Sequence, residues 1–221
     1  MVRIRAIFFD LDGTLVSEWP LVMTFLPIVY SEISKKIGVP KYKAREIFLR
    51  EIENRKGTYE WHDWNFFFEL FKLPFKFEDF LLRYPDRIEV FSGVPEVLDS
   101  LSRKYILGVI TSGPKYQELK LALTNLRKYF DVIITRDHVK AVKPDPKIFI
   151  AALEKAGVEA GESLMVGDNL EQDVLGAKGV GMKAVWINPS NDNSYNIADF
   201  EIKSILELPR ILEVIENEED I

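Results

Sequence analysis

The sequence has 221 residues, a hydrophobic share of 47%, a charged share of 29% and a formal net charge of −6. This length suits one core domain with a smaller insert, and the composition is that of a folded globular chain. The acidic balance argues against nucleic acid or an anionic membrane as a partner, because both attract basic faces. Cysteine is absent, which excludes disulfides, thiolate metal sites and cysteine nucleophiles.

Two apolar stretches near the N-terminus do not predict export or a membrane span. Asp10 and Asp12 interrupt the first, residues 4–15, and no small-residue cleavage signature follows it. The second, residues 21–30, contains Pro27 and is far shorter than the roughly 18 apolar residues that a span requires. We therefore expect a cytoplasmic protein, with a monomer as the default state and a homodimer as the alternative.

Short apolar or β-branched runs alternate with helical patterns along most of the chain. The runs precede polar or glycine-containing stretches, as the strands of a parallel sheet do. The expected strands are residues 4–9, 106–111, 132–135, 164–167 and 184–187. The expected helices are residues 95–103, 116–126, 146–156, 171–178 and 205–215. This alternation predicts an α/β fold with a Rossmann-like, doubly wound parallel sheet.

Residues 16–88 interrupt the alternation. They contain no convincing strand, and their apolar residues recur at roughly helical spacing, which predicts three or four helices. Residues 38–40 read Gly-Val-Pro and form a plausible break between two of these helices. A turn at residues 93–95 then leads back into the alternating pattern. We expect a core domain of residues 1–15 and 89–221 with an inserted helical domain of residues 16–88.

Two carboxylates follow the first expected strand. Asp10 and Asp12 end it, and Gly13 and Thr14 come next. Residues two apart in an extended chain face the same side, so both carboxylates can address one site at the strand end. One can attack and bind a cation, while the other can carry a proton if its neighbour raises its pKa. A plain strand-ending turn is the structural alternative.

Hydroxyl and ammonium groups follow later strands. Thr111, Ser112 and Gly113 end the second expected strand, and glycine lets main-chain N–H groups approach an anion. Lys143 precedes a helix that is expected to begin at Pro146. Taken alone, each feature is commonplace, because hydroxyls often cap helices and loop lysines are mostly solvated.

Further carboxylates follow the fourth expected strand. Asp168 lies at its tip after Gly167, Asn169 comes next, and Asp173 lies five residues beyond Asp168 in the first helical turns. Oxygen ligands grouped in this way suit Mg²⁺, which takes one or two carboxylates together with waters and phosphate oxygens. The alternative role for Asp168 is a helix cap, and the alternative for Asp173 is that of an exposed helical acid.

The four motifs, in this order and over nearly the whole chain, resemble those of the haloacid dehalogenase-like hydrolases. The resemblance implies that residues 16–88 form a C1 cap domain, similar in its position in the chain to the caps of phosphoglycolate phosphatases and β-phosphoglucomutases. It also implies a phosphatase that hydrolyses a small phosphorylated metabolite through an aspartyl-phosphate.

The resemblance further implies a role for each catalytic motif residue. Asp10 is the nucleophile, and Asp12 protonates the leaving alkoxide and then acts as base for the hydrolytic water. Thr111 and the main chain of Ser112 and Gly113 hold phosphate oxygens. Lys143 offsets the charge of the phosphoryl group and of the nucleophile.

The same resemblance implies a magnesium site. The expected ligands are Asp10, the main-chain carbonyl of Asp12, and Asp168. The expected supporting residues are Thr14, Asn169 and Asp173. A metal also follows from physical reasoning, because a carboxylate cannot approach a phosphate dianion without a cation between them.

Substrate choice is expected to depend on the inserted domain, since the core motifs address only the phosphoryl group. The candidate specificity residues are Glu18, Trp19 and Trp61. Core packing is the alternative role for the aromatic residues, and His62 is equally well explained as an ordinary surface residue. A cap over the site implies small substrates and makes proteins and nucleic acids poor ones.

Three other functions remain open. A phosphomutase shares the first half of the reaction and differs in whether the cap excludes water. A 2-haloacid dehalogenase on this fold lacks the second aspartate and needs no metal, whereas this chain has both Asp12 and Asp168. A non-catalytic binding module would be expected to lose acidic or lysine positions, all of which are present here.

Overall fold

The computed structural model describes residues 3–190 and 197–219. The chain divides into two compact units. The core unit comprises Met1–Ser17 and Val90–Ile221, and the helical unit comprises Glu18–Glu89. Two short strands, β2 (Val16–Ser17) and β3 (Glu89–Val90), pair where the chain passes from one unit to the other. The strand at Val16–Ser17 corrects the expectation that residues 16–88 contain no strand.

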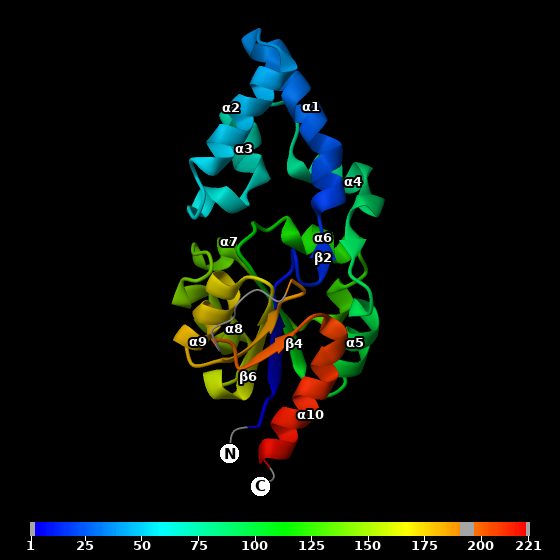
Figure 1. The fold of residues 1–221 in the computed structure, drawn as a ribbon, viewed down its shortest axis with the longest axis vertical. Helices are drawn as coiled ribbons and strands as arrows, with labels where there is room; N and C mark the ends of the chain where they lie inside the picture. Colours follow the sequence, from blue (N-terminus) through cyan, green and yellow to red (C-terminus); the bar gives the residue numbers. More distant parts are fainter. Residues whose placement is uncertain (1–2, 191–196, 220–221) are drawn as a thin grey trace. The chain divides into compact units, whose positions relative to one another are not determined.

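A six-stranded parallel sheet forms the centre of the core unit (Figure 1). Its order is β5-β4-β1-β6-β7-β8. The strands are β1 (Ala6–Phe9), β4 (Ile106–Thr111), β5 (Val132–Thr135), β6 (Ser163–Gly167), β7 (Lys183–Ile187) and β8 (Phe200–Ile202). The predicted α/β fold with a doubly wound parallel sheet is confirmed. The edge strand β8 was not predicted, since it is short and its three residues do not form an apolar run.

Helices cover both faces of this sheet. Figure 1 shows α8 (Pro146–Ala156) and α9 (Gly176–Gly179) on one side, with α5 (Val94–Leu101) and α10 (Leu208–Glu219) on the other. The remaining helices and helical turns of this unit are α6 (Gln117–Leu123), η3 (Arg127–Tyr129), α7 (Arg136–Val139), η4 (Ala160–Glu162), η5 (Leu170–Leu175) and η6 (Ile205–Glu207).

Two predicted helices are divided in the structure. The helix predicted for residues 171–178 consists of the π-helical turn η5 followed by α9, and Val174 N donates to Asn169 O, five residues back, at 3.4 Å. The helix predicted for residues 205–215 begins with the turn η6 and continues to Glu219. Wide π-turns inside helices often occur at functional sites.

The central strand β1 is buried on both faces, as its run of apolar residues requires. Phe8 packs in a core cluster with Ile110, Phe149 and Met165. Gly108 on the neighbouring strand makes room for this ring, because a Cβ at that position would lie 2.5 Å from it. The carboxyl end of β1, where the first motif begins, therefore has a firmly packed base.

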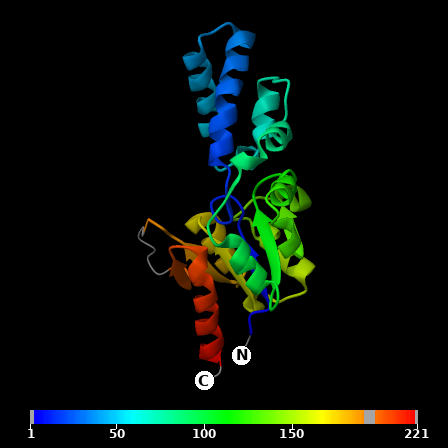
Figure 2. The same ribbon diagram turned by 90° about the vertical axis from the view of Figure 1, so that its right-hand side faces the viewer.

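The helical unit has a core of its own, made mainly of aromatic rings. It contains α1 (Trp19–Ile37), α2 (Lys41–Glu53), α3 (Trp64–Leu70) and α4 (Phe77–Arg83), with the turns η1 (Tyr59–His62) and η2 (Pro85–Arg87). Figure 2 shows α1 and α2 running side by side. Gly38, in the left-handed conformation at φ 70°, ends α1 before α2 begins. Phe25 lies 5.0–5.8 Å from the rings of Trp64, Phe68, Phe77 and Phe80.

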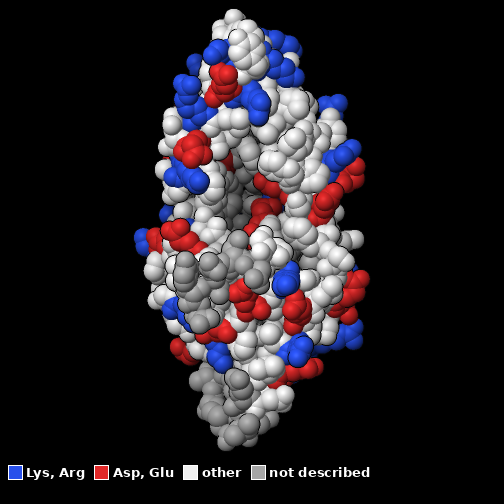
Figure 3. Space-filling view, viewed as in Figure 1, with Lys and Arg blue, Asp and Glu red and all other residues white. Residues whose placement is uncertain are grey.

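Positive charge gathers at one end of the helical unit, where α1 passes into α2 (Figure 3). The sequence there carries Lys35, Lys36, Lys41, Lys43 and Arg45. Lys35 pairs with Glu32 at 2.7 Å and Lys43 with Glu46 at 3.0 Å, so part of this charge is neutralised at the surface.

Among residues 3–190 and 197–219, every helix is too short or too polar to span a lipid bilayer.

Candidate active site

The motif residues meet at the carboxyl edge of the sheet. Strand β1 lies between β4 and β6, and the chain proceeds outward from β4 on one side and from β6 on the other. Such a reversal of strand order opens a crevice at the strand ends, where α/β proteins bind their ligands. Asp10 follows β1, Thr111 ends β4 and Asp168 follows β6.

Three carboxylates lie beside one buried lysine in this crevice. Asp10, Asp168 and Asp173 each offer an oxygen within 4.8 Å of the others. The Lys143 ammonium donates to Asp10 Oδ1 at 2.5 Å and to Asp173 Oδ1 at 2.6 Å. The other oxygen of Asp173 accepts from Asn169 N at 3.0 Å. Asp173 therefore orients the lysine and the strand-end loop and is buried, in contrast to the alternative of an exposed helical acid.

The pKa values of this cluster depend first on burial and then on the neighbouring charges. Burial raises the pKa of Asp10 to about 7, with the charge of Lys143 opposing the rise and that of Asp173 adding to it. Burial, together with the charge of Asp10, raises the pKa of Asp168 to about 6. Burial favours the neutral amine of Lys143, but the carboxylates of Asp10 and Asp173 outweigh this and raise its pKa.

The donor set fits a divalent metal ion. Three ionised carboxylates and one ammonium leave two net negative charges in a largely buried site. A doubly charged cation would balance them and, by favouring the ionised carboxylates, would lower the pKa values of Asp10 and Asp168. The acidic cluster can therefore hold a metal, and hard oxygen donors of this kind suit Mg²⁺ or a similar ion.

Two glycines leave the space that these carboxylates occupy. Gly13 has φ 96°, and a Cβ there would lie 2.4 Å from an oxygen of Asp168. A Cβ on Gly167 would lie 2.3 Å from an oxygen of Asp173. The glycines of the first and fourth motifs thus allow close approach of side chains as well as a turn.

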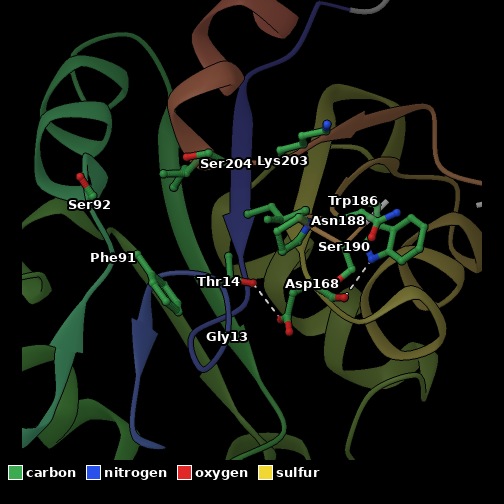
Figure 4. A pocket seen from close by; sticks show the side chains of 13 residues that line it. Gly13, Thr14, Phe91, Ser92, Asp168, Trp186, Asn188, Ser190, Lys203 and Ser204 are labelled. Carbon is green, nitrogen blue, oxygen red and sulfur yellow. Dashed lines mark hydrogen bonds between the residues drawn. The ribbon is translucent and has the colours of Figure 1, made fainter. Parts of the chain in front are cut away.

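Asp168 is further oriented by its neighbours (Figure 4). The Thr14 hydroxyl donates to Asp168 Oδ1 at 3.1 Å, and the Trp186 indole donates to the Asp168 carbonyl at 2.9 Å. A cavity of about 510 Å³ opens beside this carboxylate within the core unit. The Asn169 side chain caps the following turn by accepting from Glu171 N at 3.1 Å and Gln172 N at 2.9 Å. The cap is Asn169, so the alternative of Asp168 as the helix cap is wrong.

The second motif is linked to the lysine loop. Thr111 Oγ1 accepts from Gly113 N at 3.1 Å, so this contact does not use the hydroxyl proton of Thr111. Ser112 Oγ accepts from Lys143 N at 3.0 Å, so its buried hydroxyl positions the backbone of the lysine.

The Asp12 carboxylate has partners that the sequence analysis missed. Both of its oxygens accept from Lys120 Nζ, at 2.6 and 2.8 Å, and Oδ2 also accepts from Gln117 at 2.7 Å. Both partners lie on α6, on its buried side. The signal was present as a lysine among apolar positions of an amphipathic helix, where a charge requires a buried partner.

The candidate specificity residues lie in the helical unit. Glu18 Oε1 accepts from the Trp64 indole at 3.1 Å, which ties the start of α1 to α3. Trp19 is 64% exposed, and Trp61 is half-buried with its ring 4.8 Å from that of His62. Of these three residues, Trp19 is the most exposed.

The fold is an α/β sheet with helices on both faces, and the site is a cluster of carboxylates with one lysine at the carboxyl ends of its strands. The sequence model of the haloacid dehalogenase-like hydrolases matches residues 7–187, and the chain belongs to that family. The predicted family is confirmed.

Three similar proteins match this chain over nearly their full length. Glyceraldehyde 3-phosphate phosphatase of Pyrococcus furiosus is 32% identical, over 99% of this chain and 95% of the relative. Pyrophosphatase PpaX of Halalkalibacterium halodurans is 26% identical, over 97% of this chain and 98% of the relative. The crystal structure of a HAD phosphatase from Thermococcus onnurineus is 55% identical, covers 95% of this chain and 98% of its own, and has a TM-score of 0.93.

Proposed function

We propose that this haloacid dehalogenase-like phosphatase hydrolyses a small phosphorylated metabolite, with Mg²⁺ as cofactor and Asp10 as nucleophile. Its class, a phosphatase, is confirmed by the named relatives. The observation that carries the nucleophile assignment is the position of Asp10, buried at the end of β1 with one oxygen 2.5 Å from the Lys143 ammonium. A carboxylate oriented in this way is preorganised for attack.

The first half-reaction transfers the phosphoryl group to Asp10. A carboxylate oxygen forms a bond to phosphorus while the ester P–O bond breaks, and the leaving oxygen takes a proton from Asp12. Lys143 and the Thr111 hydroxyl stabilise negative charge on the phosphoryl oxygens.

The second half-reaction releases phosphate. A water oxygen attacks phosphorus, Asp12 takes the water proton, and the bond between phosphorus and Asp10 breaks. Asp10 returns as the free carboxylate, inorganic phosphate leaves, and Asp12 is again protonated for the next cycle.

Asp10, Asp168 and the main-chain carbonyl of Asp12 would hold Mg²⁺. When bound, the ion neutralises phosphoryl charge and lets two anions meet. Both oxygens of Asp173 already accept hydrogen bonds, from Lys143 and from Asn169, which favours a supporting role for this residue over direct ligation. Thr14 and Asn169 support the site by orienting Asp168 and the η5 turn.

The substrate class is proposed from the relatives together with the helical unit. Triose phosphates, pyrophosphate and nucleotides are the first compounds to screen, because relatives are named for glyceraldehyde 3-phosphate, pyrophosphate and pyrimidine 5′-nucleotides. We propose that the helical unit is the cap and that Glu18, Trp19 and Trp61 contribute to specificity. A cytoplasmic location, and a monomer in preference to a homodimer, complete the proposal.

The test is hydrolysis of p-nitrophenyl phosphate with Mg²⁺ or with EDTA. We expect turnover with the metal and none with the chelator, and Asp10→Asn should lose activity by at least about 1,000-fold. The matched control is Asp99→Asn, which changes an exposed aspartate on α5 and should leave the rate unchanged.

Turnover that persists in EDTA would contradict the metal assignment, and an active Asp10→Asn variant would contradict the nucleophile. A screen of the same three enzymes on the metabolite panel then identifies the substrate. Conversion of one sugar phosphate into its isomer without phosphate release would instead identify a mutase.

A further inference from the structure

We infer that Lys120 and Gln117 are positioning residues for the acid–base group Asp12. This inference rests on the function proposed above. Neither residue belongs to the four motifs. Together they fix the direction of the Asp12 carboxylate at the edge of the site.

The first observation is the burial of Lys120. Its side chain is 0% exposed, and an ammonium removed from water costs several kcal/mol unless an anion pairs with it. The anion is Asp12, whose two oxygens both accept from Nζ, at 2.6 and 2.8 Å. A donor that bridges both oxygens restricts rotation of the carboxylate more than a single hydrogen bond does.

The second observation concerns Gln117, three residues before Lys120 and so on the same face of α6. Its amide nitrogen donates to Asp12 Oδ2 at 2.7 Å. A Cβ on Gly113 would lie 2.2 Å from this nitrogen, so the glycine that ends the second motif also leaves the space for Gln117. The start of α6 is therefore built around this contact.

The third observation is that the backbone of Asp12 is already fixed. Gly13 N donates to Val16 O at 2.8 Å, and Asp12 forms a β-bridge with Val16. The remaining freedom of the residue is the rotation of its side chain, which the α6 donors restrict. The side chain keeps 30% of its surface exposed, so a leaving group or a water can still reach it.

This arrangement suits a residue that transfers protons in both half-reactions. Proton transfer requires the carboxylate within hydrogen-bond reach of the leaving oxygen, and a displacement of about 1 Å can cost 100-fold in rate. Without Lys120 the carboxylate can rotate away, and the proton-transfer step slows while the phosphate and metal residues stay in place.

The test compares two substrates of nearly equal shape, phenyl phosphate and p-nitrophenyl phosphate. Phenoxide is a much stronger base than p-nitrophenoxide, so its departure depends more on the acid. The kcat/KM values report steps up to transfer of phosphate to Asp10, and the later role of Asp12 as base does not enter them.

We expect Lys120→Met to lower kcat/KM at least about 10-fold more for phenyl phosphate than for p-nitrophenyl phosphate. Asp12→Asn should show the same preference, and Gln117→Leu a smaller one. Lys120→Arg, which keeps a cationic donor, should recover part of the loss. Lys128→Met, at an exposed position beyond α6, is the matched control and should change neither value.

An equal loss on both substrates in Lys120→Met and Gln117→Leu would overturn the inference, because general damage to the fold does not distinguish leaving groups. Gln117→Leu decides the question alone if Lys120→Met does not fold. A wild-type enzyme that is inactive on both esters and on the metabolite panel would contradict the proposed function itself, which separates the two failures.

Discussion

The site of the core unit and the interior of the helical unit are built in opposite ways. The site consists of charged side chains, each oriented by hydrogen bonds of 2.5–3.1 Å to named partners. The interior of the helical unit consists of rings around Phe25 in mostly edge-on contacts. Hydrogen bonds fix the direction of a group, whereas ring packing contributes buried area and tolerates adjustment.

The difference assigns separate tasks to the two regions. In the proposed mechanism, chemistry at phosphorus requires atoms at defined positions, which Asp10, Lys143 and Asp173 of the core unit would supply. Stability of the helical unit requires apolar area, which its aromatic residues supply. Substitutions should therefore affect activity in one region and the free energy of unfolding in the other.

The largest effect is expected from Phe25→Ala, which removes the ring at the centre of the aromatic cluster. Phe25 is fully buried, so the substitution should lower the free energy of unfolding by about 3–5 kcal/mol. Chemical denaturation followed by circular dichroism measures this. Leu82→Ala, at a position 61% exposed in the same unit, is the control and should change it by less than about 0.5 kcal/mol. Equal losses in both variants would show that the rings do not form the core of the helical unit.

A smaller effect, on activity and not on stability, is expected from Asp173→Ala. Lys143 loses one of its two carboxylate partners and Asn169 N loses its acceptor. The lysine then shifts relative to Asp10, and kcat/KM should fall about 100-fold with the fold retained. Glu171→Ala, an exposed acid on the same turn, should leave kcat/KM unchanged. A loss of less than threefold in Asp173→Ala would mean that Asp10 alone positions the lysine.

The next prediction concerns metal and pH together. Because burial raises the pKa of Asp10 to about 7 and of Asp168 to about 6, the metal-free folded protein holds more protons than the unfolded chain between about pH 4 and 7. Its stability therefore falls as pH rises through this window. Mg²⁺ must displace these protons, so its stabilising effect grows as pH rises.

Thermal unfolding with Mg²⁺ and with EDTA at pH 5.5 and pH 8 measures this linkage. At a Mg²⁺ concentration ten times the Kd measured at pH 8, the ion should add about 1.4 kcal/mol to the free energy of unfolding at pH 8. The same concentration should add clearly less at pH 5.5. Asp168→Asn should abolish the increment. The same rise in Tm at both pH values would show that Asp10 and Asp168, the carboxyls with raised pKa values, are not the metal ligands.

The sequence predicted the sheet well and the site only in part. Strands and motifs are local patterns, so the sequence placed Asp10 and Asp168 at strand ends and Lys143 in the loop before a helix. The pairing of Asp12 with Lys120 joins residues 108 positions apart in the chain. Helical spacing marks Lys120 as buried, but no local pattern names its partner. The π-turn η5 also escaped prediction, because it depends on where Asp173 and Asn169 bond in three dimensions.

The smallest effect comes from two helix caps, one in each unit. Asp63 accepts from Asn65 N at the start of α3, and Asp145 accepts from Lys147 N at the start of α8, both at 2.9 Å. Replacing either aspartate by alanine should cost about 1 kcal/mol of stability. Asp145, however, lies two residues after Lys143, so its loss also loosens the loop that carries the ammonium. Asp145→Ala should therefore lower kcat/KM several-fold, whereas Asp63→Ala should leave hydrolysis of p-nitrophenyl phosphate unchanged at equal loss of Tm. Equal activity in the two variants would mean that Ser112 and the two carboxylates position Lys143 without help from the helix.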